Sequence, residues 1–240
     1  MSENKLKLEN KLHEIAKDNK IALAYSGGVD SSILKTVAEL AGIDVLPLTF
    51  DLSESLKLKE VRMNDKERCY YCKSLMMSTF KRIAAEAGYE VLCDGTNADD
   101  RKQYRPGLRA LEENGVISPI AEAGITKEEL RAIGKELGLP VASKPSSPCL
   151  LTRFPYGTFV TDEMLDAVDN AERIVKEAGF EACRVRVYGA LSKVEVPVEE
   201  IALAQKENLT EKLCEVLRSI GVEKVDFDPK GLRSGTMDEN

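Results

Sequence analysis

The sequence predicts an α/β fold, with a doubly wound parallel sheet in residues 1–148 and a smaller α+β domain in residues 149–240. Three observations lead to this prediction. Apolar runs of strand length alternate with helical patterns over the first 145 residues. Three prolines then interrupt regular structure, at Pro145, Pro148 and Pro155. A chain of 240 residues is also long enough to form two domains with separate cores.

The first predicted strand and helix enclose a candidate phosphate loop. The strand is Ile21–Tyr25, and the loop is Ser26-Gly27-Gly28-Val29-Asp30-Ser31-Ser32. A buried helical face follows, with apolar residues at helical spacing: Ile33, Leu34, Val37, Ala38 and Ala41. The glycines permit a tight turn, and we expect Asp30 or Ser31 to cap the helix, whose amides then face an anion. The alternative interpretation is a turn that binds no ligand.

Further strands are predicted at residues 45–50, 90–93 and 116–120. The next helix begins at Thr126 with a capping box and ends at Gly138. Ligands of such sheets lie beyond the carboxyl ends of the strands. The loop Asp94-Gly95-Thr96-Asn97-Ala98-Asp99-Asp100 follows one of these strands and is rich in oxygen side chains. We therefore expect this loop and the phosphate loop to share one nucleotide and its Mg²⁺.

The second domain is predicted to contain helices at residues 162–178 and 208–220 and strands at 183–188, 193–196 and 224–227. Arg184 and Arg186 alternate on the first of these strands, so both side chains project from one face. Two neighbouring guanidinium groups suit a phosphate or carboxylate ligand. The alternative interpretation is a solvated strand face.

Composition narrows the class of protein. The net charge of -7 argues against general nucleic-acid binding. No apolar stretch reaches the roughly 18 residues of a membrane helix, and residues 1–20 are polar, so we expect a cytoplasmic protein without a membrane partner. Six cysteines without a secretion signal indicate a reducing compartment. The single histidine, His13, excludes metal sites that need several imidazoles.

The cysteines fall into two groups. Cys93, Cys183 and Cys214 occupy apolar positions and are interpreted as core residues, whereas Cys69, Cys72 and Cys149 lie outside such patterns. Four interpretations of the second group remain open: unrelated surface thiols, a redox dithiol, a structural zinc site, or an iron–sulfur cluster held by three thiolates. The redox interpretation is weakened because the Cys-x-x-Cys pair is not predicted at a helix start after a strand. Zinc usually takes four ligands, and no fourth is evident. Three thiolates would leave one iron of a cluster open to sulfide or substrate.

Several segments together carry a family resemblance. The phosphate loop resembles the SGGxDS loop of the PP-loop ATP pyrophosphatases. The more specific segments are residues 94–100 with Tyr104-Arg105-Pro106-Gly107, Lys144-Pro145 with Cys149-Leu150 and Arg153, Arg184-Val185-Arg186, and Arg233-Ser234-Gly235. With the loop, they resemble the LarE family, PP-loop sulfur transferases of nickel-pincer nucleotide synthesis. The resemblance implies that ATP and Mg²⁺ adenylate a carboxylate of pyridinium-3,5-biscarboxylic acid mononucleotide, after which sulfur replaces the carboxylate oxygen.

The family contains two sulfur sources. In one type, a cysteine aligned with Cys149 surrenders its own sulfur; in the other, three cysteines hold a [4Fe-4S] cluster that carries an extra sulfide. Because Cys69 and Cys72 are present as well as Cys149, the chain resembles the cluster type. A sacrificial Cys149 remains the alternative. The resemblance also implies a sulfide donor as partner and a homo-oligomer with threefold-related units.

The chemistry assigns a role to each candidate residue. Ser26, Ser31, Ser32 and the loop amides would hold pyrophosphate, and Asp30 would help to place Mg²⁺. The nucleotide would be bordered by Asp94, Gly95 and Thr96 and by the main chain of Thr49 and Phe50. Arg184 and Arg186 would bind the substrate, with Arg105 and Arg153 as weaker candidates. Arg153 would orient substrate, lower a thiol pKa or form a surface ion pair.

Three other classes of function stay open on sequence. A tRNA thiolase also combines such a loop with cysteines, although the acidic charge and the lack of a recognisable RNA-binding module count against it. An ammonia-using ligase would not explain three cysteines outside the core. A non-catalytic nucleotide- or cluster-binding module would bind ATP without releasing pyrophosphate.

Overall fold

The computed structural model describes residues 2–102, 106–145, 148–204 and 208–233. The chain forms two compact units, residues 1–61 with 67–146 and residues 62–66 with 147–240. The predicted boundary at residues 148–149 lies beside this junction, whereas the segment 62–66 joins the second unit from within the first part of the sequence. The functions expected of the two domains stay predictions.

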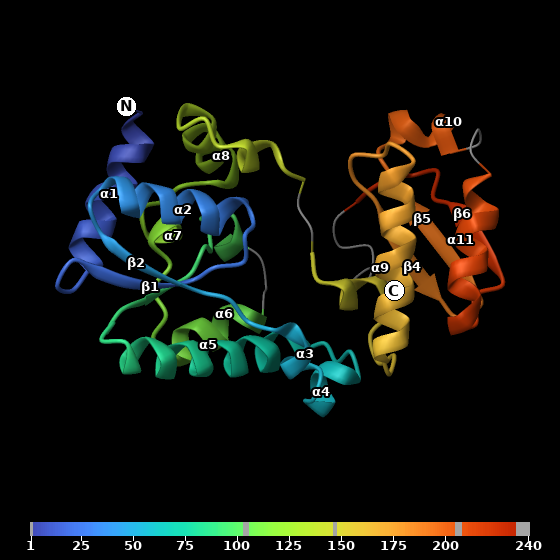
Figure 1. Ribbon diagram of the computed structural model, residues 1–240, viewed down its shortest axis with the longest axis horizontal. Coiled ribbons are helices and arrows are strands. Elements are labelled where there is room, and N and C mark those ends of the chain that lie inside the picture. Colours follow the sequence, from blue (N-terminus) through green and yellow to red (C-terminus); the bar gives the residue numbers. More distant parts are fainter. Residues whose placement is uncertain (1, 103–105, 146–147, 205–207, 234–240) are drawn as a thin grey trace. The chain divides into compact units, whose positions relative to one another are not determined.

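The first unit is built around a parallel sheet (Figure 1). Its strands are β1 (Lys20–Ala24), β2 (Asp44–Leu48) and β3 (Leu92–Cys93), in the order β2-β1-β3. The register pairs Ala24 with Leu48 and Leu23 with Cys93. The helices are α1 (Glu3–Ile15), α2 (Val29–Leu40), α3 (Leu52–Ser55), α4 (Lys59–Arg62), α5 (Arg68–Glu86), α6 (Pro106–Glu113), α7 (Pro119–Glu122) and α8 (Lys127–Glu136), with 3₁₀ turns η1 (Asp100–Lys102) and η2 (Pro140–Ser143).

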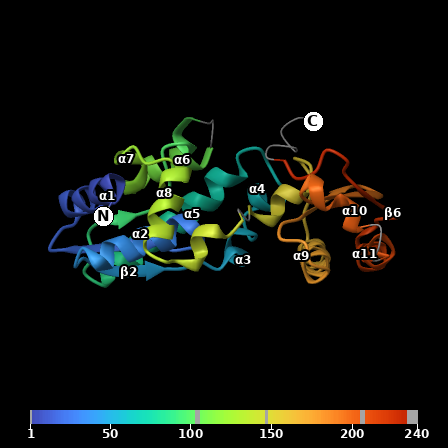
Figure 2. The same cartoon turned by 90° about the horizontal axis from the view of Figure 1, so that it is seen from above.

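The central strand β1 is buried on both of its faces. Ile21 and Leu23 pack with apolar residues of α1, α2 and α8, while Ala22 packs with residues of α5 and α6. Figure 1 shows α1 and α2 on one side of β1 and α5 on the other. The helices α2 and α8 lie side by side in both views (Figures 1 and 2). This α/β arrangement around a parallel sheet confirms the predicted fold class at that level.

The close packing of α8 depends on a glycine. A Cβ atom added to Gly134 would lie 2.7 Å from Cδ1 of Ile33 on α2 and 2.8 Å from Cβ of Ala142. Real side chains do not approach so closely, so the absence of a Cβ lets α8 approach α2. The capping box that marks the start of α8 is formed as predicted, between Thr126 and Glu129.

One predicted strand is wrong. Residues 116–120 contribute an isolated parallel bridge between Cys93 and Ile117, and α7 begins at Pro119. Proline has no N–H for a sheet ladder but fits the first turn of a helix, which explains why pairing stops here. The strand predicted at 90–93 is also shorter, because β3 holds two residues.

The second unit contains a mixed three-stranded sheet. Strand β4 (Arg184–Tyr188) pairs antiparallel with β5 (Leu191–Glu195), which pairs parallel with β6 (Lys224–Phe227). The helices are α9 (Asp162–Glu177), α10 (Ile201–Ala204) and α11 (Leu209–Leu217), with 3₁₀ turns η3 (Leu150–Arg153), η4 (Val198–Glu200) and η5 (Arg218–Ile220). The core includes Val168, Val175, Val185, Val194 and Leu213, all with no exposed surface.

The segment 62–66 is tied to the second unit by hydrogen bonds. The buried amide of Asn64 donates to the carbonyl oxygens of Phe154 and Pro155, at 3.0 and 2.9 Å. The backbone N–H of Val160 donates to Arg62, and the Arg62 guanidinium forms an ion pair with Asp162 at 2.8 Å. These bonds connect residues about 90 positions apart, which local sequence patterns do not predict.

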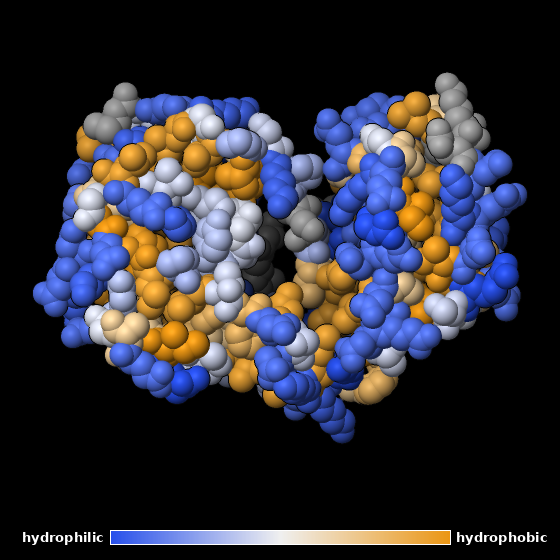
Figure 3. Space-filling view, viewed as in Figure 1, coloured by the Kyte–Doolittle hydropathy of each residue, from blue (hydrophilic) through white to orange (hydrophobic). Residues whose placement is uncertain are grey.

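On the visible face, hydrophobic residues form several patches among hydrophilic ones (Figure 3). Among the helices that the structure describes, none has the length and hydropathy needed to span a membrane.

Candidate functional site

The loops after β1, β2 and β3 meet at one edge of the parallel sheet, because the carboxyl ends of parallel strands lie together. The phosphate loop turns at Gly27, whose φ of +67° favours glycine. Its serines form a compact network, in which the hydroxyl oxygens of Ser26 and Ser31 lie 3.2 Å apart. The Ser32 hydroxyl donates to Tyr25 Oη at 3.3 Å.

The predicted cap of α2 is wrong. Gly28 is the N-cap, while Asp30 and Ser31 already lie in the first turn of the helix. The extended backbone of Gly28 (φ -80°, ψ 175°) lets the helix begin two residues earlier than expected. Within the described residues, no side-chain hydrogen bond caps α2. Its N-terminus is therefore suited to an anion.

The loop after β3 packs directly against this helix start. A Cβ atom on Gly95 would lie 3.1 Å from the backbone nitrogen of Ser31 and 3.2 Å from Cβ of Asp30. The buried carboxylate of Asp94 accepts hydrogen bonds from the hydroxyls of Thr96 and Ser118 and from the backbone N–H of Thr96. The structure thus brings together the two loops that the sequence suggested would share a nucleotide.

Thr49 and Phe50 follow the end of β2 at the same edge. Thr49 is exposed, and Phe50 is half-buried with its ring edge-on to Phe80 at 6.1 Å. The strand predicted to end at Phe50 ends at Leu48, which leaves both residues in the loop.

Two lysines that the sequence analysis did not single out reach this edge. The amine of Lys127, the first residue of α8, lies 2.5 and 2.7 Å from the two carboxylate oxygens of Asp30. The amine of Lys73, on α5, lies 3.9 Å from Asp94 Oδ2. The alkyl chain of Lys73 runs past Gly107, where an added Cβ would come within 2.9 Å of it. Lys73 follows the Cys-x-x-Cys pair directly, and this adjacency was the available sequence signal.

Cys69 and Cys72 lie in the first turns of α5, so the expectation that the pair is not at a helix start is wrong. Residues three apart on a helix share a face. Cys69 is exposed, and the half-buried thiol of Cys72 donates to the Ser55 hydroxyl at 3.1 Å. Burial raises the pKa of Cys72, and the Ser55 hydrogen bond offsets part of that effect.

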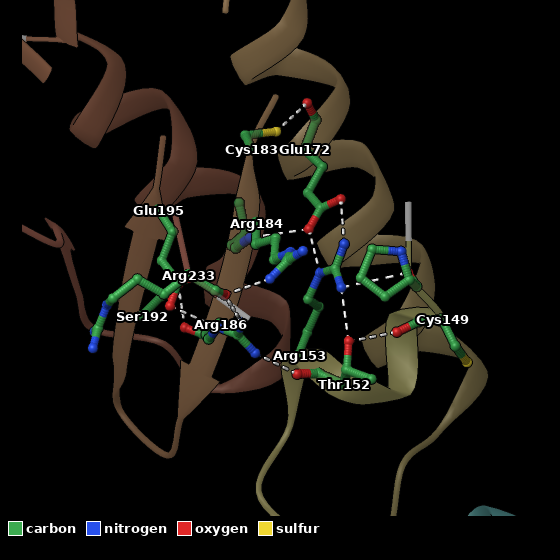
Figure 4. A network of polar contacts seen from close by, with 12 residues as sticks. Cys149, Thr152, Arg153, Glu172, Cys183, Arg184, Arg186, Ser192, Glu195 and Arg233 are labelled. Carbon is green, nitrogen blue, oxygen red and sulfur yellow. Dashed lines mark hydrogen bonds and ion pairs between the residues drawn. The ribbon is translucent and has the colours of Figure 1, made fainter. Parts of the chain in front are cut away.

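Cys149 belongs to the second unit, at the N-cap of η3. It is exposed, and its carbonyl oxygen accepts a hydrogen bond from the Thr152 hydroxyl at 2.7 Å. Figure 4 shows the sulfur pointing away from the neighbouring arginines. In the part of the chain that the structure describes, no three His, Cys, Asp or Glu side chains are gathered as a metal site.

The arginines of the second unit are buried, which contradicts both a solvated strand face for Arg184 and Arg186 and a surface ion pair for Arg153 (Figure 4). Arg153 Nε lies 2.6 Å from Glu172 on α9, and Arg186 Nε lies 2.7 Å from Glu195 on β5. The sequence missed these carboxylates because their helix and strand meet the arginines only through the tertiary packing.

Arg184 differs from its neighbours because, within the described residues, no carboxylate pairs with it. Its guanidinium donates to the carbonyl oxygen of Arg233, whose own side chain pairs with Asp228 at 3.1 Å. Burial lowers the pKa of Arg184, and the charges of Arg186 and Arg153 lower it further. Four arginines thus face three carboxylates, and the remaining positive charge favours an anionic ligand. Arg105, the fourth candidate from sequence, lies outside the described residues.

Alkylation of the folded protein by iodoacetamide at about pH 8 is expected to separate the cysteines. Exposed Cys69 and Cys149 should react first, and Cys72 should accelerate only at a higher pH than an ordinary thiol because its thiolate is disfavoured. Burial and the charge of Glu172 raise the pKa of Cys183 from 9.0 to about 12, which leaves about a thousandfold less thiolate. Buried Cys93 should also resist.

Peptide mass spectrometry over a time course measures these rates, and urea-unfolded protein provides the reference in which all six thiols react. Rapid labelling of Cys183 without unfolding would contradict the assignment of that residue to the core.

Comparison with models of protein families gave no match. The chain is 34% identical to an uncharacterised protein of Synechocystis sp., over 96% of each chain. It is 30% identical to pyridinium-3,5-bisthiocarboxylic acid mononucleotide synthase of Lactiplantibacillus plantarum, over 92% of this chain and 89% of that one. It is 28% identical to a GMP synthase of Archaeoglobus fulgidus, over 71% of this chain and 69% of that one. With its phosphate loop and its match to the mononucleotide synthase over nearly the whole length, the chain belongs to the LarE family of PP-loop proteins.

Proposed function

We propose that the chain is an ATP-dependent sulfur transferase that converts the carboxylates of pyridinium-3,5-biscarboxylic acid mononucleotide to thiocarboxylates, for nickel-pincer nucleotide synthesis. The observation that carries the proposal is the contact between the helix start at Ser31 and Gly95 of the second loop, in a relative of a named bisthiocarboxylic acid mononucleotide synthase. For the architecture we propose a doubly wound nucleotide-binding sheet and a smaller α+β substrate domain in residues 149–240.

The first step activates the carboxylate. Oxide is a poor leaving group, so sulfur does not displace it directly at neutral pH. A substrate carboxylate oxygen attacks the α-phosphorus of ATP, the bond from this phosphorus to the bridging oxygen breaks, and pyrophosphate leaves. The amides at the start of α2 and the hydroxyls of Ser26, Ser31 and Ser32 stabilise the departing charge. The partly exposed carboxylate of Asp30 offers the oxygen ligands that Mg²⁺ prefers.

The second step exchanges AMP for sulfur. Sulfur attacks the acyl carbon, a carbon–sulfur bond forms, and the bond to the AMP oxygen breaks. Arg184 and Arg186 bind the phosphate or the second carboxylate of the substrate, and the unmatched charge of Arg184 supports this role. Arg153 acts on Cys149 and the substrate indirectly: its guanidinium donates to the Thr152 hydroxyl at 2.8 Å, and this hydroxyl binds the Cys149 carbonyl.

For the sulfur source we propose Cys69, Cys72 and Cys149 as ligands of a [4Fe-4S] cluster. The two thiols on one face of α5 suit adjacent irons, and Cys149 is exposed. When bound, such a cluster supplies an open iron that carries a transferable sulfide. A separate sulfide donor replenishes it, and the protein works as a homo-oligomer of threefold-related units.

The test is a product analysis. Protein supplied with ATP, Mg²⁺ and the biscarboxylic mononucleotide is expected to release AMP and pyrophosphate in equal amounts, and to release neither when the mononucleotide is omitted. Chromatography of the nucleotides and an enzymatic pyrophosphate assay measure both products. Release of ADP and phosphate would contradict the proposed adenylation. ATP binding without any cleavage would favour a non-catalytic module.

A further inference from the structure

The ion pair between Lys127 and Asp30 lies inside the phosphate site and has no role in the steps above. Both oxygens of the Asp30 carboxylate contact the amine, and the two side chains are 33% and 25% exposed. The pair therefore stands at the solvent-facing side of the loop, where a ligand can reach it. Asp30 is in the first turn of α2, the position at which an anion binds most favourably.

The backbone fixes where the Lys127 side chain starts. The N–H of Lys127 donates to Asp99 Oδ2 at 3.0 Å, and the capping box of Thr126 and Glu129 holds the same turn of α8. Asp99 belongs to the loop that packs against the phosphate loop through Gly95. The long alkyl chain of lysine can then move its amine while its Cα stays in place.

Electrostatics give this pair two alternative arrangements. A carboxylate beside a polyphosphate is repelled unless a cation lies between them, and in the nucleotide-free protein the cation on Asp30 is Lys127. Mg²⁺ that arrives with ATP is a second cation for the same carboxylate oxygens. Both cations cannot occupy the two oxygens fully, whereas the phosphates offer the displaced amine new charged acceptors.

We propose that Lys127 is a mobile phosphate-binding residue that occupies Asp30 until Mg·ATP arrives, then yields Asp30 to the metal and binds the phosphate oxygens. This inference rests on the proposed function. It adds a residue to the nucleotide site and predicts opposite effects on two ligands. Removal of the amine weakens nucleotide binding but strengthens metal binding to the nucleotide-free protein.

The experiment compares Lys127→Gln with wild type. Isothermal titration measures binding of the Mg²⁺ complex of α,β-methylene-ATP, whose α–β bond is not hydrolysed. Electron paramagnetic resonance measures binding of Mn²⁺ alone, as a spectroscopic substitute for Mg²⁺. The variant is expected to bind the nucleotide complex about tenfold or more weakly, because a charged hydrogen-bond donor is lost. It is expected to bind Mn²⁺ several-fold more tightly, because Asp30 is released.

Three further variants make the outcome specific. Lys135→Gln removes an exposed lysine at the other end of α8 and should alter neither affinity. Lys127→Arg retains a cation and should keep the affinity for the nucleotide complex close to that of wild type. In Lys127→Gln combined with Asp30→Asn, the gain in Mn²⁺ affinity should disappear. Thermal unfolding of each variant establishes that the protein is folded.

The proposal is overturned if Lys127→Gln leaves Mn²⁺ binding unchanged, if it weakens both ligands together, or if it binds the nucleotide complex as wild type does. Weakening of both ligands would mean that Lys127 only maintains the shape of the loop. Failure of wild type to bind the nucleotide complex at all would instead refute the proposed function, and the inference with it.

Discussion

Replacement of Cys149 by alanine is expected to lower thiocarboxylate formation by about a thousandfold or more while leaving carboxylate-dependent release of pyrophosphate in place. The reason is chemical: whether Cys149 holds a cluster or donates its own sulfur, alanine supplies no sulfur atom. Adenylation needs only the phosphate loop and the substrate, and the loop belongs to the other unit of the chain. Mass spectrometry of the product, together with a pyrophosphate assay on the same sample, measures both steps.

The matched control is Cys214→Ala, which removes a half-buried thiol whose hydrogen bond to the Glu223 carbonyl lies within the second unit. It should retain both activities. Thiocarboxylate formation by Cys149→Ala at a rate near that of wild type would exclude this residue from sulfur transfer.

Cys72→Ala, purified and reconstituted with iron without oxygen, distinguishes the two sulfur sources. A cluster held by three thiolates loses a ligand, so multiple turnovers should cease. A sacrificial Cys149 would still give one turnover per chain, with loss of mass as hydrogen sulfide. Full multi-turnover activity of this variant would refute the cluster assignment.

Arg153→Ala is expected to reduce the free energy of unfolding by about 3–5 kcal/mol, because it leaves the Glu172 carboxylate buried without its partner. The Arg153 and Glu172 side chains are 2% and 4% exposed. The backbone N–H of Val185 donates to Glu172 at 3.0 Å, but it cannot replace a guanidinium charge. Chemical denaturation followed by circular dichroism measures the loss.

Two companion variants test the cause. Arg173→Ala breaks an exposed pair with Glu177 on the same helix as Glu172, and should cost less than about 1 kcal/mol. Arg153→Met combined with Glu172→Leu removes both charges and should recover much of the stability lost by Arg153→Ala. A loss below about 1 kcal/mol in Arg153→Ala would show that the pair is not buried in solution.

The sequence alone determined the features that depend on neighbouring residues. The phosphate loop follows from two glycines between a strand and a helix, and the start of α8 follows from the Thr126–Glu129 spacing. The alternation of Arg184 and Arg186 on β4 follows from the two-residue period of a strand. Sterics and periodicity act over a few residues, so a local pattern carries this information.

Only the tertiary structure decided which distant groups meet. Lys127 and Asp30 are 97 residues apart in the sequence, and the buried pairing of Arg153 with Glu172 depends on how α9 packs. The same limit explains the wrong strand at residues 116–120, where an apolar run fits a strand but Pro119 starts a helix. A charge in the sequence does not name its partner, because burial and pairing are set by packing between elements, whereas a turn or a cap is set by the residues that form it.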